Sequence, residues 1–155
     1  MFGNCNKKKC ENGSDRESCW KMIESNYKFY LAFENSICKD YFTEKVFRIL
    51  QYDVVPVVMG GADYATDLPP NSYIDVSNFS SPKDLAQYLT KVAQDEELFN
   101  SYFKWKENFV VKQASLENDL CKICDFSISQ LSCARNGTNL YDWWFKGGEC
   151  KSGQA

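Results

Sequence analysis

The chain has 155 residues, of which 18 are basic and 21 acidic, so its formal net charge is −3 at pH 7. A chain of this length folds as one domain and buries roughly two thirds of the surface of its unfolded form. The small net charge provides no strong positive field, so the sequence argues against nucleic acid as a partner. Histidine is absent from the sequence, which excludes His-based triads and His metal ligands.

The first 26 residues place Cys5, Cys10 and Cys19 among Lys, Asn, Gly and Ser, which predicts an irregular lead-in pinned by disulfides. A high cysteine content and N-x-[ST] sites are typical of secretory proteins. No run approaches the roughly 20 apolar residues that span a bilayer, and the first residues lack an apolar signal segment. We therefore expect this chain to be the C-terminal piece of a longer secretory protein. The disulfide candidates are Cys5, Cys10, Cys19, Cys38, Cys121, Cys124, Cys133 and Cys150, and the glycosylation candidates are Asn12, Asn78 and Asn136.

A strand, a helix and a second strand are predicted between residues 27 and 59. Residues 27–33 (YKFYLAF) are apolar at nearly every position, as in a parallel strand covered on both faces. Thr43 is a suitable N-cap for a helix whose apolar face holds Val46, Phe47 and Leu50. Residues 54–59 (VVPVVM) form a second buried strand, with a bulge or unpaired position expected at Pro56 because proline has no N–H. The three elements make a right-handed βαβ unit.

The next elements are a third strand and two helices. The second strand ends at Gly60-Gly61, which indicates a turn or a close approach of backbone to a ligand. Residues 62–72 form a loop and residues 73–76 a short strand. Ser81-Pro82-Lys83-Asp84 begins a helix that runs to about residue 93. A helix over residues 96–109 carries an aromatic face that we assign to core packing. The pattern predicts an α/β fold with a parallel sheet flanked by helices.

The segment between the first strand and the first helix, residues 33–45 (FENSICKDYFTEK), concentrates groups that suit a nucleotide diphosphate. The start of the helix at Thr43-Glu44-Lys45 combines free N–H groups, a hydroxyl, a carboxylate and an ammonium. The helix dipole and Lys45 could neutralise a departing diphosphate. Taken alone, the segment also fits a capped surface helix with an exposed Glu44–Lys45 pair.

This segment, followed by VVPVVMG at residues 54–60, resembles the donor-binding signature of the α1,3-fucosyltransferases, which transfer fucose from GDP-fucose to N-acetylglucosamine of glycans. The resemblance runs from about Cys19 to Cys150 and includes SYFKWK (101–106), CKIC (121–124) and NLYDWWFKGGEC (139–150). The last motif is similar to the invertebrate branch that acts on the innermost N-acetylglucosamine of N-glycans. Enzymes of this family are Golgi membrane proteins, anchored through their N-terminal region, with two Rossmann-like halves. The resemblance implies the C-terminal, donor-binding half of a GT-B glycosyltransferase on the lumenal side of the Golgi membrane.

The resemblance also implies roles for particular residues. It assigns the ribose hydroxyls to Glu44, the phosphates to Lys45, and contacts with the nucleotide sugar to Asn35 and Tyr41. Glu34 is assigned a donor-site or structural role. The transfer is inverting and needs no metal. The general base belongs to the half that this chain does not match, so the 155 residues alone are expected to be inactive. The donor-binding set is Glu34, Asn35, Tyr41, Thr43, Glu44 and Lys45; the expected partners are GDP-fucose and an N-glycan acceptor.

The cysteine-rich ends leave alternatives open. We expect a lead-in over residues 1–26, a GDP-fucose-binding core over residues 27–110 and a Cys-rich helical closure over residues 111–155. Structural disulfides are preferred for Cys121 and Cys124 over a redox pair or a zinc site with Cys5 and Cys10. The pair Trp143-Trp144 is expected to be buried rather than to stack on a sugar. The rival functions are a non-catalytic nucleotide-sugar-binding fragment and a disulfide or zinc interaction module.

Overall fold

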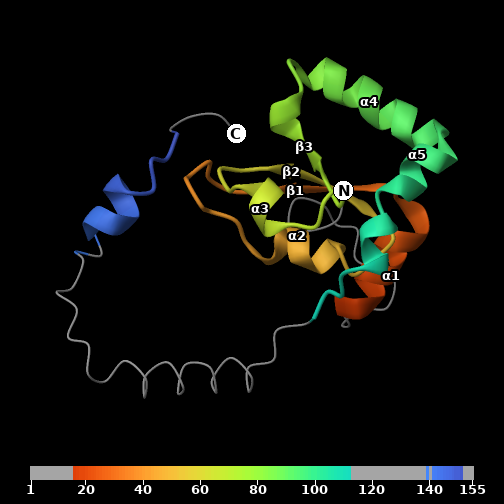
Figure 1. The fold of residues 1–155 in the computed structure, drawn as a ribbon, viewed down its shortest axis with the longest axis horizontal. Helices are drawn as coiled ribbons and strands as arrows, with labels where there is room; N and C mark the ends of the chain where they lie inside the picture. Colours follow the sequence, from red (N-terminus) through yellow and green to blue (C-terminus); the bar gives the residue numbers. More distant parts are fainter. Residues whose placement is uncertain (1–15, 113–138, 140, 152–155) are drawn as a thin grey trace, which may run out of the picture.

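The computed structural model describes residues 16–112, 139 and 141–151, which Figure 1 draws in colour. Three parallel strands form one sheet in the order β1-β2-β3. The strands are β1 (Phe29–Phe33), β2 (Val55–Met59) and β3 (Ile74–Asp75). The predicted α/β class with a parallel sheet is confirmed.

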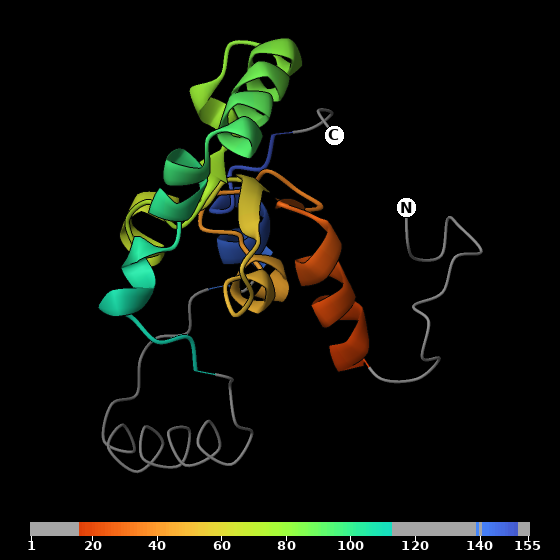
Figure 2. The same cartoon turned by 90° about the vertical axis from the view of Figure 1, so that its right-hand side faces the viewer.

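Helices cover both faces of this sheet. One layer holds α1, α2 and α3, and the other holds α4 and α5, as the two perpendicular views show (Figures 1 and 2). The helices are α1 (Arg16–Asn26), α2 (Glu44–Ile49), α3 (Tyr64–Asp67), α4 (Pro82–Gln94) and α5 (Glu96–Ser101), with 3₁₀ turns η1 (Val76–Asn78) and η2 (Lys104–Glu107) and a short π-helix η3 (Asp142–Lys146).

The strand β2 is the centre of the core. Side chains alternate between the two faces of a strand, so Val55 and Val57 face α4 and α5, while Val58 packs with Val46 of α2. All of these valines have 1% or less of their surface exposed. The helix α4 presents Leu85, Tyr88, Leu89 and Val92 to this core, and the aromatic residues Phe99, Tyr102, Phe103 and Trp105 pack into it. The prediction that these aromatic residues serve core packing is confirmed.

The strand β1 lies at an edge of the described sheet, and one of its residues faces solvent. Leu31 is 58% exposed, although Ala32 beside it is buried against α2. The expectation that this strand is covered on both faces is therefore wrong at Leu31. An apolar sequence identified a strand but could not distinguish an edge position from a central one.

Pro56 sits in a regular part of the ladder with β1, so there is no bulge, but the alternative prediction of an unpaired position is confirmed on the side of β3. It pairs with Tyr30 in an unbroken register from Phe29↔Val55 to Phe33↔Met59. The N–H of Val55 donates to the carbonyl of Lys28, and the carbonyl of Met59 accepts from the N–H of Glu34, so both groups face β1. Because backbone groups alternate in direction along a strand, the Pro56 nitrogen faces β3. There β3 pairs only with Val57 and Val58. No ladder partner is lost because β3 is too short to reach Pro56.

Several helix boundaries differ from the predictions. The stretch expected to be irregular contains α1 from residue 16 onward, and the expected loop at residues 62–72 contains α3, whose N-cap Asp63 accepts from Thr66 N–H. The helix predicted for residues 96–109 ends at Ser101, and a 3₁₀ turn follows. In α2, Ile49 replaces the predicted Phe47 on the buried face, and Phe47 is 39% exposed.

Candidate functional site

The predicted site begins at Glu34, at the edge of the sheet where all three strands end. Glu34 follows β1, Gly60 follows β2, and Asp75 is the last residue of β3. Because the strands are parallel, these carboxyl ends share one edge of the sheet, which is where α/β proteins bind ligands. The N–H of Glu34 donates to the carbonyl of Met59 at 2.8 Å, which continues the pairing of β1 with β2 by one residue.

The side chain of Glu34 is buried and fully engaged. Its carboxylate accepts hydrogen bonds from the Thr43 N–H (2.8 Å), from the Thr43 hydroxyl (2.9 and 3.0 Å to its two oxygens) and from Lys45 Nζ (2.6 Å). Only 1% of this side chain is exposed, against 27% for Lys45. The Thr43 hydroxyl turns to Glu34 and makes no cap bond to α2. Thr43 therefore occupies the predicted N-cap position but binds a different partner.

The ion pair controls the charge of both residues. Burial, the largest influence, raises the pKa of Glu34, but the hydrogen bonds from Lys45 and Thr43 and the charge of Lys45 together outweigh it. The net effect is a pKa below the ordinary 4.5. The hydrogen bond to Glu34 raises the pKa of Lys45, and burial only partly opposes this. Both groups are charged at neutral pH.

One N–H of Lys45 has no acceptor among the described residues. An ammonium has three N–H bonds; Glu34 takes one, and the Thr43 hydroxyl takes another at 3.0 Å. No further acceptor for Lys45 occurs among the residues that the structure describes. Glu44 and Asn35 are exposed at either end of the same loop, and Tyr41 is half-buried. The structure thus brings Glu34, Thr43 and Lys45 into contact and leaves Glu44 and Asn35 open to solvent.

Gly60 and Gly61 allow two loops to approach each other closely. A Cβ on Gly61 would lie 2.1 Å from the backbone carbonyl oxygen of Cys38. Asp40, which has a positive φ of 58°, donates its N–H to the Gly61 carbonyl at 3.2 Å. The glycine pair therefore packs the loop after β2 against the loop after β1. Sequence reasoning offered a turn or a ligand approach for this pair and missed the contact with Cys38.

Tyr64 is a buried residue at this edge that sequence reasoning missed. A Cβ on Gly60 would lie 2.3 Å from the Tyr64 hydroxyl and 3.2 Å from Glu34 Cγ. Tyr64 is 4% exposed, and its hydroxyl has no hydrogen-bond partner within the described part of the chain. Burial, with the charges of Glu34 and Asp75, raises its pKa to about 12. The sequence carries no signal for this residue beyond its distance of three residues from Gly61.

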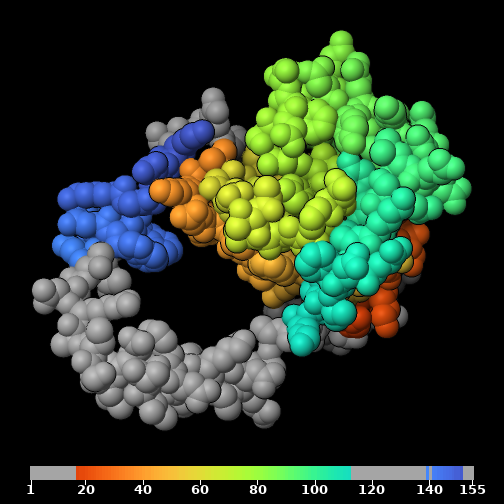
Figure 3. Space-filling model, in the orientation of Figure 1, coloured from red at the N-terminus to blue at the C-terminus, as the bar shows by residue number. Residues whose placement is uncertain are grey.

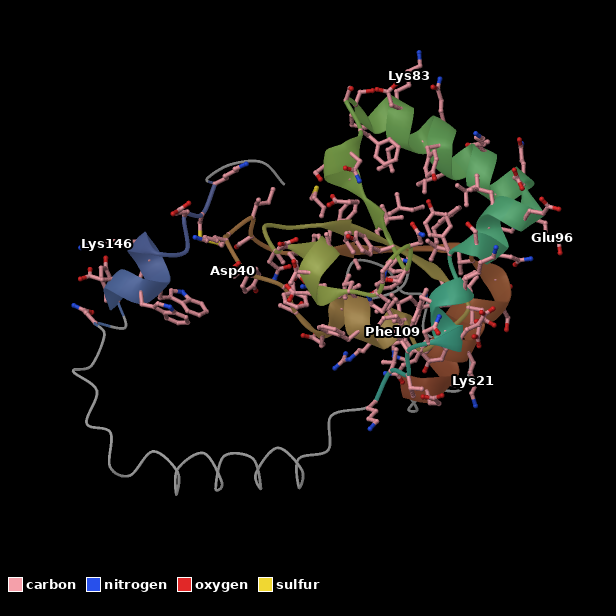
Figure 4. The ribbon with its side chains drawn as sticks, in the orientation of Figure 1. Lys21, Asp40, Lys83, Glu96, Phe109 and Lys146 are labelled. Carbon is pink, nitrogen blue, oxygen red and sulfur yellow. A yellow bond between two sulfur atoms is a disulfide. The ribbon has the colours of Figure 1, made fainter. Side chains whose placement is uncertain are left out.

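A disulfide joins the loop after β1 to the C-terminal segment. Cys38 and Cys150 are bonded across a sequence separation of 112 residues. Lys39 N–H donates to the Gly148 carbonyl, and Lys151 N–H donates to the Ile37 carbonyl. Residues 141–151 (blue) consequently lie beside the orange loop in Figure 3, on the side away from α4 and α5. Figure 4 labels Asp40 in this loop and Lys146 farther out on the C-terminal segment.

The aromatic residues of this segment are exposed. Trp143 is 59% and Trp144 57% exposed, as are most of the surfaces of Tyr141 and Phe145. The prediction that the tryptophan pair is buried is wrong. The segment is joined to the loop after β1 by backbone bonds and a disulfide, contacts that place the backbone of η3 without covering its side chains.

Most cysteine and glycosylation candidates lie outside the described residues. Cys19 is disulfide-bonded, as are Cys38 and Cys150; Cys5, Cys10, Cys121, Cys124, Cys133, Asn12 and Asn136 are not described. Asn78 is exposed in η1. Over residues 16–112, 139 and 141–151, no group of three or more candidate ligands could hold a metal ion. No helix in that part of the chain is long and apolar enough to cross a membrane.

Comparison with known proteins identifies the family. The family model described as "Glycosyltransferase family 10 (fucosyltransferase) C-term" matches residues 1–143. The chain belongs to this family. Alpha-(1,3)-fucosyltransferase C of Drosophila melanogaster is 42% identical over 94% of the chain, and glycoprotein 3-alpha-L-fucosyltransferase A of the same organism is 44% identical over 97%. The human protein named 3-galactosyl-N-acetylglucosaminide 4-alpha-L-fucosyltransferase is 48% identical over 77%.

The match covers only part of these family 10 relatives. The chain spans 33% and 30% of the two Drosophila proteins and 34% of the human protein. Among solved structures, an alpha1,3-fucosyltransferase with GDP aligns with a TM-score of 0.55 and 24% identity, over 72% of this chain and 34% of that chain. A second alpha1,3-fucosyltransferase structure aligns with a TM-score of 0.53 and 21% identity, over 82% and 37%. These structures support the Rossmann-like α/β fold.

Proposed function

We propose that this chain is the donor-binding part of an α1,3-fucosyltransferase that transfers fucose from GDP-fucose to N-acetylglucosamine of N-glycans in the Golgi lumen. The names of the two Drosophila relatives support the linkage, and one of them specifies glycoprotein as the acceptor class. The cysteines and the exposed sequon at Asn78 fit the lumen.

The observation that carries this proposal is the arrangement around Lys45. Its ammonium is fixed by Glu34 and Thr43 and has one N–H without an acceptor among the described residues. It lies at the carboxyl ends of the parallel strands, the usual position of nucleotide sites in such sheets. Glu44, the residue before Lys45, is exposed and is free to contact ribose hydroxyls.

The chemistry that this arrangement supports is stabilisation of a leaving group. When the bond between fucose and GDP breaks, negative charge develops on the diphosphate. A lysine already aimed at that position stabilises the charge without rearrangement. In the proposed reaction, the acceptor hydroxyl attacks the anomeric carbon while Lys45 receives the departing GDP, and the base that deprotonates the hydroxyl lies outside the described residues.

The test is calorimetric titration of the full chain with GDP. Losing one charge-assisted hydrogen bond costs about 1.5 to 3 kcal/mol, so Lys45→Ala is expected to weaken GDP binding by roughly ten-fold or more. Lys106→Ala is the matched control, because Lys106 pairs with Asp53 at 2.7 Å and is 31% exposed, close to the 27% of Lys45. Equal affinities for wild type and Lys45→Ala would overturn the assignment.

A further inference from the structure

We infer that Glu34 is a positioning residue for the nucleotide: its buried carboxylate holds Lys45 and Thr43 in the geometry that receives the diphosphate. This inference rests on the proposed function and gives Glu34 a more specific role than donor contact. With 1% of its side chain exposed, Glu34 is closed to a ligand. Its effect on a nucleotide must pass through the residues that it binds.

The contacts of Glu34 link the sheet to the start of α2. Its backbone N–H bonds to Met59 of the central strand, and its carboxylate accepts from the N–H and the hydroxyl of Thr43 and from Lys45. The three residues therefore form a closed set, since Lys45 also donates to the Thr43 hydroxyl. Glu34 therefore fixes the ammonium relative to the rigid β1–β2 pair rather than relative to the loop.

Holding a lysine before the ligand arrives has a direct benefit. A free lysine side chain has many rotamers, and ordering them on binding reduces affinity. Lys45 has lost that freedom already, because two acceptors fix its Nζ. The remaining N–H is the one available to a phosphate oxygen.

The negative charge of Glu34, taken by itself, would weaken nucleotide binding. Its carboxylate cancels the charge of Lys45 and repels a diphosphate, so removing the negative charge would strengthen nucleotide binding if long-range attraction dominated. Positioning and charge therefore predict changes of opposite sign for the same substitution.

The experiment compares GDP affinity in Glu34→Gln and Asp53→Asn by calorimetry on the full chain. Both changes replace a carboxylate beside a partly exposed lysine by an amide and remove one negative charge. Asp53 lies just before β2, at the opposite edge of the sheet from Glu34, and its pair with Lys106 is 2.7 Å long. The control therefore reproduces the change in net charge without touching the site.

Positioning predicts that Glu34→Gln weakens GDP binding by about ten-fold and that Asp53→Asn changes it by less than about two-fold. Glu34→Asp keeps the charge but shortens the side chain by one methylene, so it is also expected to weaken binding; it decides the question if Glu34→Gln fails to fold. Unchanged or tighter binding in the folded Glu34 variants would overturn the inference and leave the proposed function intact. No GDP binding by wild type would overturn both.

A second readout needs no nucleotide. The alkaline titration of Lys45, followed by the NMR shift of its Cε, is expected to have its midpoint above the ordinary 10.5 in wild type and to move down in Glu34→Gln. A role of Glu34 in core packing without an ion pair to Lys45 would not produce this change. A wild-type midpoint at the ordinary value would contradict the ion pair on which the inference rests.

Discussion

At the end of β1, a buried carboxylate stays ionised because its partners replace water. Glu34 has four hydrogen-bond distances of 2.6 to 3.0 Å to Thr43 and Lys45. Burying a carboxylate is unfavourable unless such partners are present. Removing one partner leaves the other charge buried without compensation. The charged state of this residue is therefore a property of the cluster.

The depressed pKa of Glu34 predicts a dependence of stability on pH. A carboxyl group whose folded-state pKa lies below its unfolded value stabilises the fold above the unfolded value, and this contribution is lost as pH falls through the folded value. At neutral pH we expect Glu34→Gln to lower the free energy of unfolding by about 1.5 to 3 kcal/mol. The difference from wild type should shrink below the ordinary pKa of 4.5. Urea denaturation at several pH values measures it, and a constant difference would contradict the ion pair.

Gly60 and Tyr64 form a second testable pair. The Tyr64 hydroxyl occupies the place of a Cβ on Gly60, at 2.3 Å, so Gly60→Ala is expected to destabilise the fold by about 1 to 3 kcal/mol. Tyr64→Phe removes a buried hydroxyl that has no partner in the described residues, so it should be neutral or stabilising. In the double variant the cost of the alanine should largely disappear. Thermal unfolding of the four proteins gives the coupling, and additive effects would show that the contact is absent.

Among the elements, the loop after β1 is held by contacts with three other parts of the fold. Glu34 ties its start to α2, Asp40 bonds to Gly61, and Cys38 bonds to Cys150. Loops carry binding residues best when a rigid scaffold fixes them. Here β2, α2 and the C-terminal segment act together as that scaffold.

Removing the disulfide between Cys38 and Cys150 should destabilise the loop after β1 and the C-terminal segment that it joins. Native disulfides contribute about 2 to 5 kcal/mol, and the contribution grows with the length of the loop closed. Cys150→Ser opens a link between residues 112 positions apart, so we expect a loss of that size in stability and faster proteolysis within residues 141–151. Cys38→Ser provides the control, because it opens the same link, whereas reductant would also break the disulfide of Cys19. Equal stability of the oxidised proteins would contradict this prediction.

On the scale of the molecule, the described sheet has the proposed site at the carboxyl ends of its strands and an exposed residue on its edge strand β1. The described sheet has three strands with helices on both faces, and the exposed Leu31 lies on β1, away from β3. The chain covers about a third of its relatives' length. The proposed donor site would hold one substrate.

We therefore expect the 155 residues alone to bind GDP-fucose without transferring fucose. Orienting two reactants supplies about 7 to 11 kcal/mol, and general base catalysis a further 10² to 10⁴ in rate. The proposed site provides neither an acceptor position nor a base among the described residues. Radiolabelled GDP-fucose with an N-glycan acceptor is the assay, with GDP binding by the same preparation as the control. Turnover by the purified chain would contradict this prediction and place the catalytic base within these 155 residues.

Local sequence was sufficient for the three strands and for the starts of α2 and α4, but it missed α1 and α3. The apolar run of β2 and the Ser81-Pro82 start of α4 depend on periodicity and capping, which act over a few residues, and both appear as predicted. The polar segment after β1 could be placed at the carboxyl edge because parallel topology brings strand ends together. The family was also recognisable from these motifs.

The tertiary structure decided which residues meet. Whether Glu34 contacts a ligand or Lys45, whether Pro56 loses a partner, and whether Trp143 is covered all depend on neighbours distant in sequence, and a local pattern does not specify them. The bond between Cys38 and Cys150 is one of many pairings that eight cysteines allow. The sequence by itself determined most of the elements and the edge of the sheet at which the polar segment lies, because hydrogen bonding and hydrophobic alternation are local. The packing of the folded chain decided the contacts, because burial depends on every element that reaches the same point.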